Sequence, residues 1–528
     1  MAGRVVKDDI KKIELTWPGK HDNELEQISA RRIDTRLRVV ERVQETRATR
    51  ETKRSPKQTT LHDHGNPKES VPSSNWVNKL VRGENMAVMA SFLEEFEGKI
   101  DLVYIDPPFA TGTDFSFTTA IGDDDMAIDA SKRIVTIEEK AYGDSWGKSL
   151  DSYLQMMHER LVLIHRLLSE KGMLYLHCDW RVVHYLKVML DSIFGHSGDE
   201  REEAGFKSEI IWFHQVIGMP RTNAFYFPKQ HETILAYSKS RKDKIVFNAG
   251  DKRLRKEFSE SIKKAVKKDD QGNAYYKRGR TGTKNEWAYD PKYLQTKVNL
   301  ENGVLVADVW DEWKSYQPRK NEKTGYPTQK PEQILERIIA ASTNPGDLVA
   351  DFFCGSGTTL AVAERLGRRW IGCDVGRLAV HTAFKRLLGI EGCKPFDLLE
   401  IGGDAEAASQ ARAEARVKVE GKKAMVELTG FTILDPGRVP PELKGVIPGW
   451  KDYVDYWAID FDFRENTFVN RWCSYRTLQD RNLELVSRPF EYRSSGKYKI
   501  MIKVVDVFGT VTSESHCIEI TADANTKT

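Results

Sequence analysis

The sequence lacks several features that define common protein classes. Its six cysteines, at positions 178, 354, 373, 393, 473 and 517, form no Cys-x-x-Cys pair, so we expect no zinc site and no bound metal. No apolar run reaches membrane-spanning length, and the first residues lack a signal-peptide core. We therefore expect a cytoplasmic chain without membrane contacts. Cys178, Cys354 and Cys373 fall within or beside expected strands, where they should be buried, reduced thiols.

The chain also lacks a strong net charge, because 81 basic and 78 acidic residues leave only +3. The distribution is uneven, however. Between Lys239 and Lys292, 17 Lys or Arg face 8 Asp or Glu, and aromatic residues are interleaved with them. Such a stretch is typical of nucleic-acid contact. The alternative is a solvated helix over residues 252–268.

One short motif carries the most chemical information. Asp106-Pro107-Pro108-Phe109 follows an apolar run over residues 99–105 that is typical of a buried strand. The two prolines remove backbone donors and stiffen the turn. The acid and the ring are therefore held at the carboxyl end of a strand, where open α/β sheets bind their ligands. A flat base with an amino group suits this pair, since the ring stacks on it and the carboxylate accepts its N–H.

A second pattern lies far along the chain. Residues 347–353 form another apolar run, which leads into the glycine-containing turn over residues 354–359 and then a helix. The next expected strand ends in Asp374, about 20 residues past the glycines, where such folds bind ribose hydroxyls. The third glycine of a dinucleotide fingerprint is missing, because Leu360 stands there. No Lys follows Gly357, so this is not a Walker loop either.

The alternation of Asp351, Phe353, Gly355 and Gly357 resembles motif I of S-adenosylmethionine-dependent methyltransferases. Together and in this order, the two motifs resemble the β-class amino-methyltransferases of DNA over residues 76–388. The chain is most similar to the modification subunits of Type III restriction–modification systems. Segments 78–85, 172–180 and 325–331 support the resemblance. Glu84 is a small departure, since relatives often carry Asp there.

The resemblance implies a catalytic motif, a cofactor and a DNA substrate. Asp106 would accept a hydrogen bond from the adenine amine, the carbonyl of Pro107 would accept another, and Phe109 would stack on a base flipped out of double-stranded DNA. Methyl transfer would be a direct displacement governed by positioning. S-adenosylmethionine would be bound by Asp351, Phe353, Gly355, Gly357, Thr358, Asp374, Thr328 and Lys330. DNA would be contacted by Lys263, Lys264, Lys267, Lys268, Arg278 and Arg280.

Several rival functions are weaker. Cytosine-5 methyltransferases are disfavoured because the chain has no Pro-Cys pair to supply their thiolate. An acid at the first motif position resembles adenine-N6 enzymes more than cytosine-N4 enzymes, although a cytosine-N4 DNA or an RNA amino-methyltransferase stays an alternative. A non-catalytic DNA-recognition subunit is disfavoured by the intact Asp106, Gly355 and Asp374. A nicotinamide-dependent dehydrogenase is disfavoured by the missing glycine. The sequence leaves open a homodimer and a restriction or helicase subunit as partner.

The expected fold class is α/β. It comprises a Rossmann-like methyltransferase sheet, an inserted target-recognition region and a small all-β, sandwich-like C-terminal domain. The expected segments are a charged N-terminal extension (1–74) with one or two helices over residues 24–54, a first catalytic segment with the Asp106 motif (75–238), the recognition insert (239–325), a second catalytic segment with the cofactor motif (326–408), and the C-terminal β domain with its linker (409–528).

We also expect a helix over residues 150–168, an antiparallel pair at 209–213 and 233–237, and a strand at 483–486. In the C-terminal domain, alternation over 456–463 places the Trp457 side in the sandwich core. The Tyr456 side, or the loops, would then dock a partner or a second protomer. The alternative is a purely stabilising domain.

Overall fold

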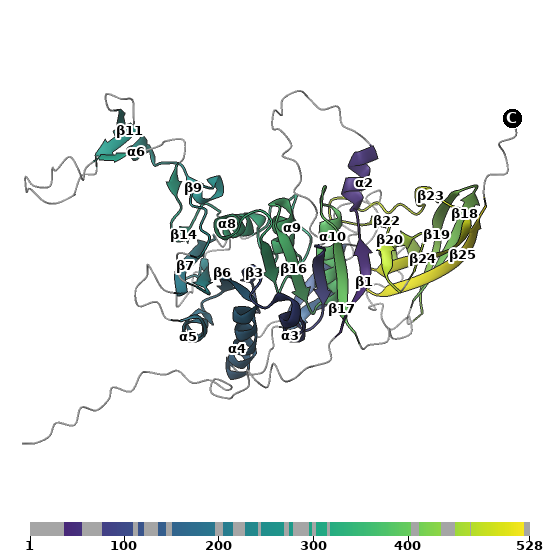
Figure 1. Ribbon diagram of the computed structural model, residues 1–528, viewed down its shortest axis with the longest axis horizontal. Helices are drawn as coiled ribbons and strands as arrows, with labels where there is room; N and C mark the ends of the chain where they lie inside the picture. The colour runs from purple at the N-terminus through teal and green to yellow at the C-terminus, as the bar shows by residue number, and fades with distance from the viewer. Residues whose placement is uncertain are drawn as a thin grey trace, which may run out of the picture.

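A computed structural model describes residues 36–54, 76–108, 114–120, 136–143, 150–195, 204–214, 227–240, 244–268, 274–277, 295–297, 303–313, 317–402, 411–434, 449–464 and 466–521. A large mixed sheet of eleven strands runs through its centre, with a smaller all-β region on one side (Figure 1). Within these ranges, no helix has both the length and the apolar character that crossing a bilayer requires.

The order of strands in the sheet differs from their order in the chain. From one edge to the other, the strands are β14 (Val309–Trp310), β7 (Gly205–Phe213), β8 (His231–Ser238), β6 (Leu168–Cys178), β3 (Ile100–Ile105), β15 (Leu348–Asp351), β16 (Arg369–Asp374), β2 (Asn78–Arg82), β17 (Phe396–Ile401), β1 (Leu37–Val43) and β21 (Phe468–Asn470).

The two motif strands are direct neighbours in the parallel centre of this sheet. Val349 of β15 pairs with Leu102 of β3, and β6 lies parallel on the other side of β3. Every residue of β3 is buried, as expected for a parallel strand that is covered on both faces. Because the strands are parallel, Asp106 and the glycine-containing turn leave the sheet at the same edge.

Helices cover both faces of the sheet, and each face has its own apolar core (Figure 1). One face packs against α3 (Asn85–Phe96), α4 (Leu150–Leu167) and α5 (Val183–Phe194). The other packs against α8 (Glu332–Ser342), α9 (Thr358–Arg365) and α10 (Arg377–Leu388). The expected α/β architecture is confirmed, as are the helix at α4 and the antiparallel pair of β7 and β8. Cys178, Cys354 and Cys373 are buried free thiols, as predicted.

The expected helices in the N-terminal extension are only half right. Residues 37–43 form β1, which pairs with β17 and with β21, and the helix α2 (Arg47–Arg54) follows. Three valines give this segment strand character, and the free edge of β17 supplies its hydrogen bonds. The expected strand at 483–486 is also wrong, because Val486 makes only an isolated bridge to Glu427.

The C-terminal region is built from two antiparallel sheets. One contains β18 (Ala411–Glu420), β19 (Lys423–Ile433) and β23 (Phe490–Glu491), and the other contains β22 (Trp472–Tyr475), β20 (Val454–Asp460), β24 (Gly496–Asp506) and β25 (Val511–Ile520). Trp457, Ile459 and Phe461 lie in the core that these sheets share, as the alternation predicted.

The opposite side of β20 is not a free docking surface. Tyr456 is buried against the catalytic body, with its ring 5.8 Å from that of Phe384 on α10. Its hydroxyl donates to Glu41 Oε1 of β1 at 2.7 Å, and Lys503 Nζ donates to Glu41 Oε2 at 2.6 Å. The expectation that the Tyr456 side docks a partner is therefore wrong, since the chain itself occupies that side.

Two groups of small sheets lie apart from this body. The hairpin of β4 (Asp114–Ala120) and β5 (Thr136–Gly143) follows the Asp106 motif. The expected recognition insert contains β9 (Arg255–Lys256) paired with β13 (Val304–Leu305), the short helix α6 (Glu260–Ala265), and the sheet of β10 (Lys267–Lys268), β11 (Ala274–Lys277) and β12 (Gln295–Lys297). In Figure 1, α6 and β11 project from the sheet at the end away from the C-terminal region.

Candidate active site

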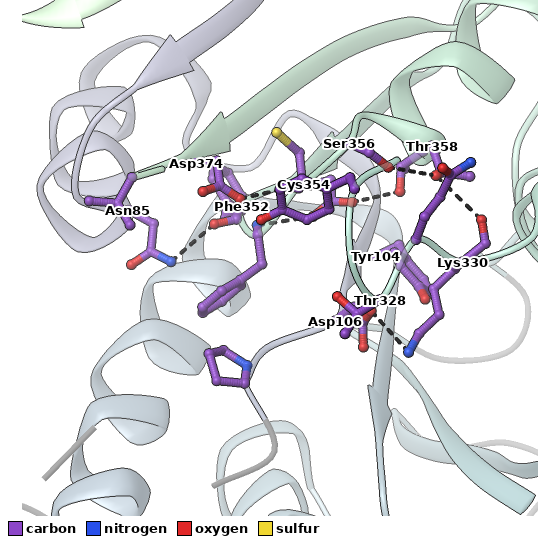
Figure 2. Close-up of a pocket in the computed structure, with 18 of the residues that line it drawn as sticks. Asn85, Tyr104, Asp106, Thr328, Lys330, Phe352, Cys354, Ser356, Thr358 and Asp374 are labelled. Carbon is purple, nitrogen blue, oxygen red and sulfur yellow. Dashed lines mark hydrogen bonds and ion pairs between the residues drawn. The ribbon is translucent and has the colours of Figure 1, made fainter. Parts of the chain in front are cut away.

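A cavity of about 290 Å³ opens at the carboxyl edge shared by the two motif strands (Figure 2). Asp106 and Pro108 line it from β3, and the turn after β15 lines it from the neighbouring strand. Of the eight predicted cofactor residues, seven line this cavity: Asp351, Phe353, Gly355, Thr358, Asp374, Thr328 and Lys330. Gly357 lies behind the lining. The fold therefore brings together residues that are more than 200 positions apart.

Asp106 is held by one oxygen only. Its Oδ2 lies 3.2 Å from Lys330 Nζ, and Figure 2 shows the two side chains meeting. Its Oδ1 is buried and has no hydrogen-bond partner among the described residues. A buried carboxylate oxygen without a donor is unfavourable in a resting protein, because its desolvation is not compensated. A ligand that supplies an N–H or O–H to Oδ1 would complete the arrangement.

Lys330 belongs to a buried polar chain that crosses three strands. Its Nζ also lies 3.2 Å from Glu232 Oε2 of β8. Glu232 Oε2 in turn lies 2.8 Å from His177 Nε2 of β6, and His177 Nδ1 lies 2.8 Å from the hydroxyl of Tyr104 on β3. Lys330 is only 6 % exposed and His177 is fully buried. Each member of the chain fixes the position of the next.

The two carboxylates of this chain respond to burial differently. Burial raises the pKa of Asp106, and the Lys330 and His177 side chains oppose that rise. Burial also disfavours ionisation of Glu232, but Lys330 and His177 outweigh it and hold the pKa of Glu232 below its usual range. The Lys330 ammonium therefore stabilises the ionised form of Glu232 more than that of Asp106, and Asp106 is the stronger base of the two.

The glycine-containing turn is fixed by its own leading acid. Asp351 Oδ1 accepts from the Phe353 amide at 3.0 Å, and Asp351 Oδ2 accepts from the Thr359 hydroxyl at 2.5 Å. Gly357 has a φ of +74°, and a Cβ there would lie 2.8 Å from Ala383 Cβ. A side chain is therefore excluded on both conformational and steric grounds. This geometry lets the backbone between β15 and α9 line the cavity directly.

Asp374 closes the cavity from β16. Its Oδ2 accepts from the Gly355 amide at 2.8 Å, and its Oδ1 accepts from the Gly376 amide at 2.8 Å. Asn85 Nδ2 donates to the Phe352 carbonyl at 3.0 Å (Figure 2). Asp374 thus ties two turns together while its carboxylate remains in the cavity wall.

A buried arginine positions the residues that open α3. Arg160 Nε donates to Asn85 Oδ1 at 2.6 Å, and its guanidinium forms an ion pair with Glu84. Glu84 Oε2 also accepts from the Ala87 amide at 2.9 Å and caps the helix. Glu at this position therefore caps the helix directly, which explains why the departure from Asp is tolerated.

The charges that line the cavity favour a cation. Glu84, Asp106, Asp351 and Asp374 are carboxylates, whereas Lys330 is the only lysine or arginine among the described residues of the lining. Burial raises the pKa of Asp106 and of Asp374, and it raises the pKa of Asp351 to about 7. A positively charged ligand would offset this accumulation of buried negative charge. The sulfonium and ammonium groups of S-adenosylmethionine fit that requirement.

Two of the predicted residues lie differently from the simple expectation. Lys330 lines the cavity, but its ammonium faces Asp106 and Glu232 rather than the glycine-containing turn. Thr328 has a φ of +60°, a strained conformation for a threonine, and it brings the segment before α8 into the cavity wall. Phe109 lies outside the described residues.

The predicted DNA contacts are placed only in part. Instead of one exposed helix over 252–268, the structure has a short turn at 252–254 and the six-residue α6. Lys263 on α6 is paired with Glu257 at 2.8 Å and with Glu260 at 3.0 Å, while Lys264 is exposed. Lys267 and Lys268 form β10, but their side chains are not described. Arg278 and Arg280 lie outside the described residues.

Sequence reasoning missed the buried polar chain. Tyr104 stands two residues before Asp106 and therefore shares its face of the strand, which is a signal that the sequence contains. His177 and Glu232 interrupt apolar strand segments, and ionisable residues are rarely buried in such positions unless they are paired. The contact between His177 and Glu232 could not be predicted from the sequence, because it depends on β8 lying next to β6 in the sheet.

Comparison with known proteins agrees with this geometry. The sequence profile of a family described as DNA methylase, of the N6 and N4 type, matches residues 100–385. The chain is similar to the Type II methyltransferase M.EcaI of Enterobacter cloacae, with 29 % identity over 346 residues, which cover 58 % of this chain and 69 % of the relative.

Two further relatives are more distant. The DNA adenine methyltransferase YhdJ of Escherichia coli K12 is 25 % identical over 319 residues, covering 60 % of this chain and 85 % of the relative. The Mod subunit of the Type III restriction-modification enzyme StyLTI of Salmonella typhimurium LT2 is 26 % identical over 364 residues, covering 59 % of this chain and 54 % of the relative.

Proposed function

We propose that this chain, which belongs to the N6/N4 family of DNA methylases, transfers a methyl group from S-adenosylmethionine to the exocyclic N6 of adenine in DNA. The relatives named as an adenine methyltransferase and as a Mod subunit favour adenine and a restriction–modification or phage-defence setting. The acid at the first position of the Asp106 motif favours the same base.

One observation carries the proposal: Asp106 Oδ1 is buried in the cavity without a donor from the described residues. The adenine amine is a poor nucleophile, because its lone pair is delocalised into the ring. A hydrogen bond from the amine to Oδ1 would favour a tetrahedral nitrogen and direct its lone pair outward. Lys330 on Oδ2 opposes the rise in the pKa of Asp106 that burial causes and positions the carboxylate. The chain's contribution is therefore positioning and electrostatic stabilisation.

The other residues of the motif would hold the base. A target atom inside a duplex is inaccessible, so the adenine must leave the helix to reach Asp106. The carbonyl of Pro107 would accept the second amine hydrogen, and Phe109 would stack on the ring. Pro108 already lines the cavity beside Asp106.

Asp374, Asn85 and the turn around Gly355 would hold the cofactor. When bound, S-adenosylmethionine supplies an electrophilic methyl group on a positively charged sulfur. The carboxylates in the cavity wall would stabilise that charge, and Asp374 would accept from ribose hydroxyls while it keeps its two backbone partners. The Tyr326 ring packs on Gly355, 3.3 Å from where a Cβ would stand, so a side chain at position 355 would be crowded.

Two variants separate the two halves of the site. Purified chain is incubated with labelled cofactor and unmethylated genomic DNA, and the methylated nucleosides are identified by mass spectrometry. Asp106→Ala should abolish transfer and leave cofactor affinity nearly unchanged. Asp374→Ala should weaken cofactor binding, measured by calorimetry, by about 1.5–3 kcal/mol.

Each possible result of these assays tests one part of the proposed reaction. Asp106→Ala activity within about tenfold of wild type, roughly 1.4 kcal/mol of barrier, would refute the role of that carboxylate. Recovery of N4-methylcytosine would assign the alternative base, and labelling of RNA but not DNA would assign the alternative substrate. A wild-type chain that binds cofactor and DNA but methylates neither would be a recognition subunit.

A further inference from the structure

Two further strands, β6 and β8, reach the edge of the sheet at which Asp106 stands. β6 lies parallel to β3, with Leu176 paired to Ile105, so β6 ends at the edge where Asp106 stands. β8 is antiparallel to β6 and begins at that edge, with Thr233 paired to Cys178. The residues just after β6 and just before β8 therefore lie at the same edge of the sheet as the catalytic cavity.

These flanking residues are aromatic and basic. Trp180 follows β6 and is 45 % exposed, a large apolar side chain left in solvent. Lys229, which precedes β8, places its Nζ 3.4 Å from the centre of the Trp180 ring, and Arg181 Cζ lies 4.8 Å from it. Phe227, two residues before Lys229, is 94 % exposed. The Trp180 ring and two cations thus share one surface, and Phe227 is exposed on the segment that carries Lys229.

This surface is held in place by the turn that follows β6. Asp179 Oδ1 accepts from the Arg181 amide at 2.8 Å, and Asp179 Oδ2 forms an ion pair with the Arg181 guanidinium. Asp179 is itself buried, so the turn is anchored to the sheet. The Trp180 ring therefore projects from a fixed base rather than from an unanchored loop.

We propose that Trp180, Arg181, Phe227 and Lys229 form the surface that receives the DNA strand beside the flipped base. The proposal rests on the proposed function, because it takes its partner from the methylated substrate. Aromatic rings stack on unpaired bases, and cations bound to such rings still reach phosphate oxygens. A nucleic-acid strand therefore matches both halves of this surface, at the edge where a base must enter.

The location also favours this surface over the predicted basic insert for contacts near the target base. Lys263 on α6 is already paired with two acids, and α6 stands out from the central sheet at the end away from the C-terminal region (Figure 1). By contrast, Trp180 lies just after the end of β6, and Lys229 lies just before the start of β8. β6 is the direct neighbour of β3, the strand that Asp106 follows. The insert remains a candidate for contacts farther along the duplex.

Binding of a fluorescently labelled random-sequence duplex, measured by anisotropy over a series of salt concentrations, tests this surface. Lys229→Ala should reduce the log–log salt slope by about 0.9, the value for one phosphate contact. Trp180→Ala should weaken binding to a duplex with an unpaired base about tenfold and leave the salt slope unchanged. Lys499→Ala is the matched control, since Lys499 also covers an aromatic ring, that of Phe463 at 5.3 Å, but in the C-terminal region.

Calorimetry with S-adenosylmethionine on the same variants should give wild-type affinity, which shows that the site is folded. If Trp180→Ala and Lys229→Ala bind DNA like the Lys499→Ala control while wild type binds and methylates, this surface is refuted and the proposed function stands. If light scattering shows that Trp180→Ala changes the number of protomers but not DNA affinity, the surface is an interface between chains and the inference is wrong. A wild type that binds no duplex would overturn both proposals.

Discussion

Replacing Lys330 by methionine should move the pH dependence of methyl transfer in a defined direction. Asp106 has to be ionised to accept the amine hydrogen. Burial raises its pKa, and Lys330 opposes that rise. Without the ammonium, the pKa of Asp106 rises further, so activity is lost at a higher pH as the solution is acidified. The acid limb of the rate profile should therefore move upward.

The magnitude follows from the distance between the two charges. At 3.2 Å between Lys330 Nζ and Asp106 Oδ2, the Coulomb attraction is about 5 kcal/mol at an effective dielectric constant of about 20. Relaxation and water entry reduce this in practice, and an opposite charge at such range typically displaces a carboxylate titration by about 1–3 pH units. Each unit corresponds to a tenfold loss of rate on the acid side, about 1.36 kcal/mol.

The assay is single-turnover transfer of labelled methyl groups to genomic DNA, followed from acid to alkaline pH with enzyme and cofactor in excess. Lys330→Arg keeps the cation and should keep the acid limb near its wild-type position. Lys330→Met should recover much of its rate at alkaline pH, where Asp106 is ionised without help. A uniform loss of rate at every pH, with the acid limb unmoved, would show that Lys330 does not control the ionisation of Asp106.

Glu232→Gln supplies a test of opposite sign. Glu232 is an anion that raises the pKa of Asp106 and shares its ammonium. Its neutralisation should move the acid limb to lower pH, whereas Lys330→Met moves it to higher pH. Displacement of both variants in the same direction would mean that general loosening of the site, and not charge, sets the profile.

Two further predictions concern the framework. Gly357→Ala should lower the free energy of unfolding and weaken cofactor binding, because the new Cβ meets Ala383 at 2.8 Å at a φ of +74°. Gly98 has a φ of +70°, and a Cβ added there would have no described atom within 4 Å, so Gly98→Ala should lower the free energy of unfolding only by the backbone contribution of about 1–2 kcal/mol. Equal losses for Gly357→Ala and Gly98→Ala in urea unfolding would contradict the steric reasoning. Glu41→Gln leaves Lys503 without its carboxylate, so the free energy of unfolding in urea should fall by about 3–5 kcal/mol. A fall below about 1 kcal/mol, the range of an exposed pair, would mean that the buried pair does not join β1 to the C-terminal sheets.

The sequence predicted those features of the fold that local patterns encode. Uninterrupted apolar runs ending in Asp106 and at the glycine-containing turn became β3 and β15, because a parallel strand covered on both faces needs apolar residues on both. Regular apolar spacing over 150–168 became α4. In these segments the residues and their surroundings select the same structure, so no knowledge of distant contacts was needed.

Features that depend on distant pairing could not be predicted in this way. Residues 37–43 lie in a longer stretch that is rich in Arg and Glu, yet they form a strand because the edge of β17 offers hydrogen bonds from far along the chain. Glu41 is buried there only because Tyr456 and Lys503 supply partners. Likewise, the ammonium of Lys330 reaches Asp106 because the segment before α8 lines the same cavity as Asp106, and a resemblance between motifs does not contain that information.

The sharing of Lys330 between two carboxylates has a chemical purpose in the proposed reaction. Methyl transfer gives the amine nitrogen positive charge, and nearby negative charge stabilises that change. If Lys330 bonded to Asp106 alone, the pair would be neutral and would stabilise it little. Because Glu232 Oε2 lies 3.2 Å from the same ammonium, Lys330 neutralises Asp106 only in part, and Asp106 keeps an excess of negative charge beside the base.

This excess gives Glu232→Gln a second expected effect. The variant should titrate at lower pH, because Lys330 then serves Asp106 alone. Its rate on the alkaline plateau should nevertheless fall, because the Asp106–Lys330 pair becomes neutral. A structural role for Glu232 alone would lower the plateau without moving the acid limb. The combination of a lower acid limb and a lower plateau therefore identifies Glu232 as the residue that keeps Asp106 negative while it is held in place.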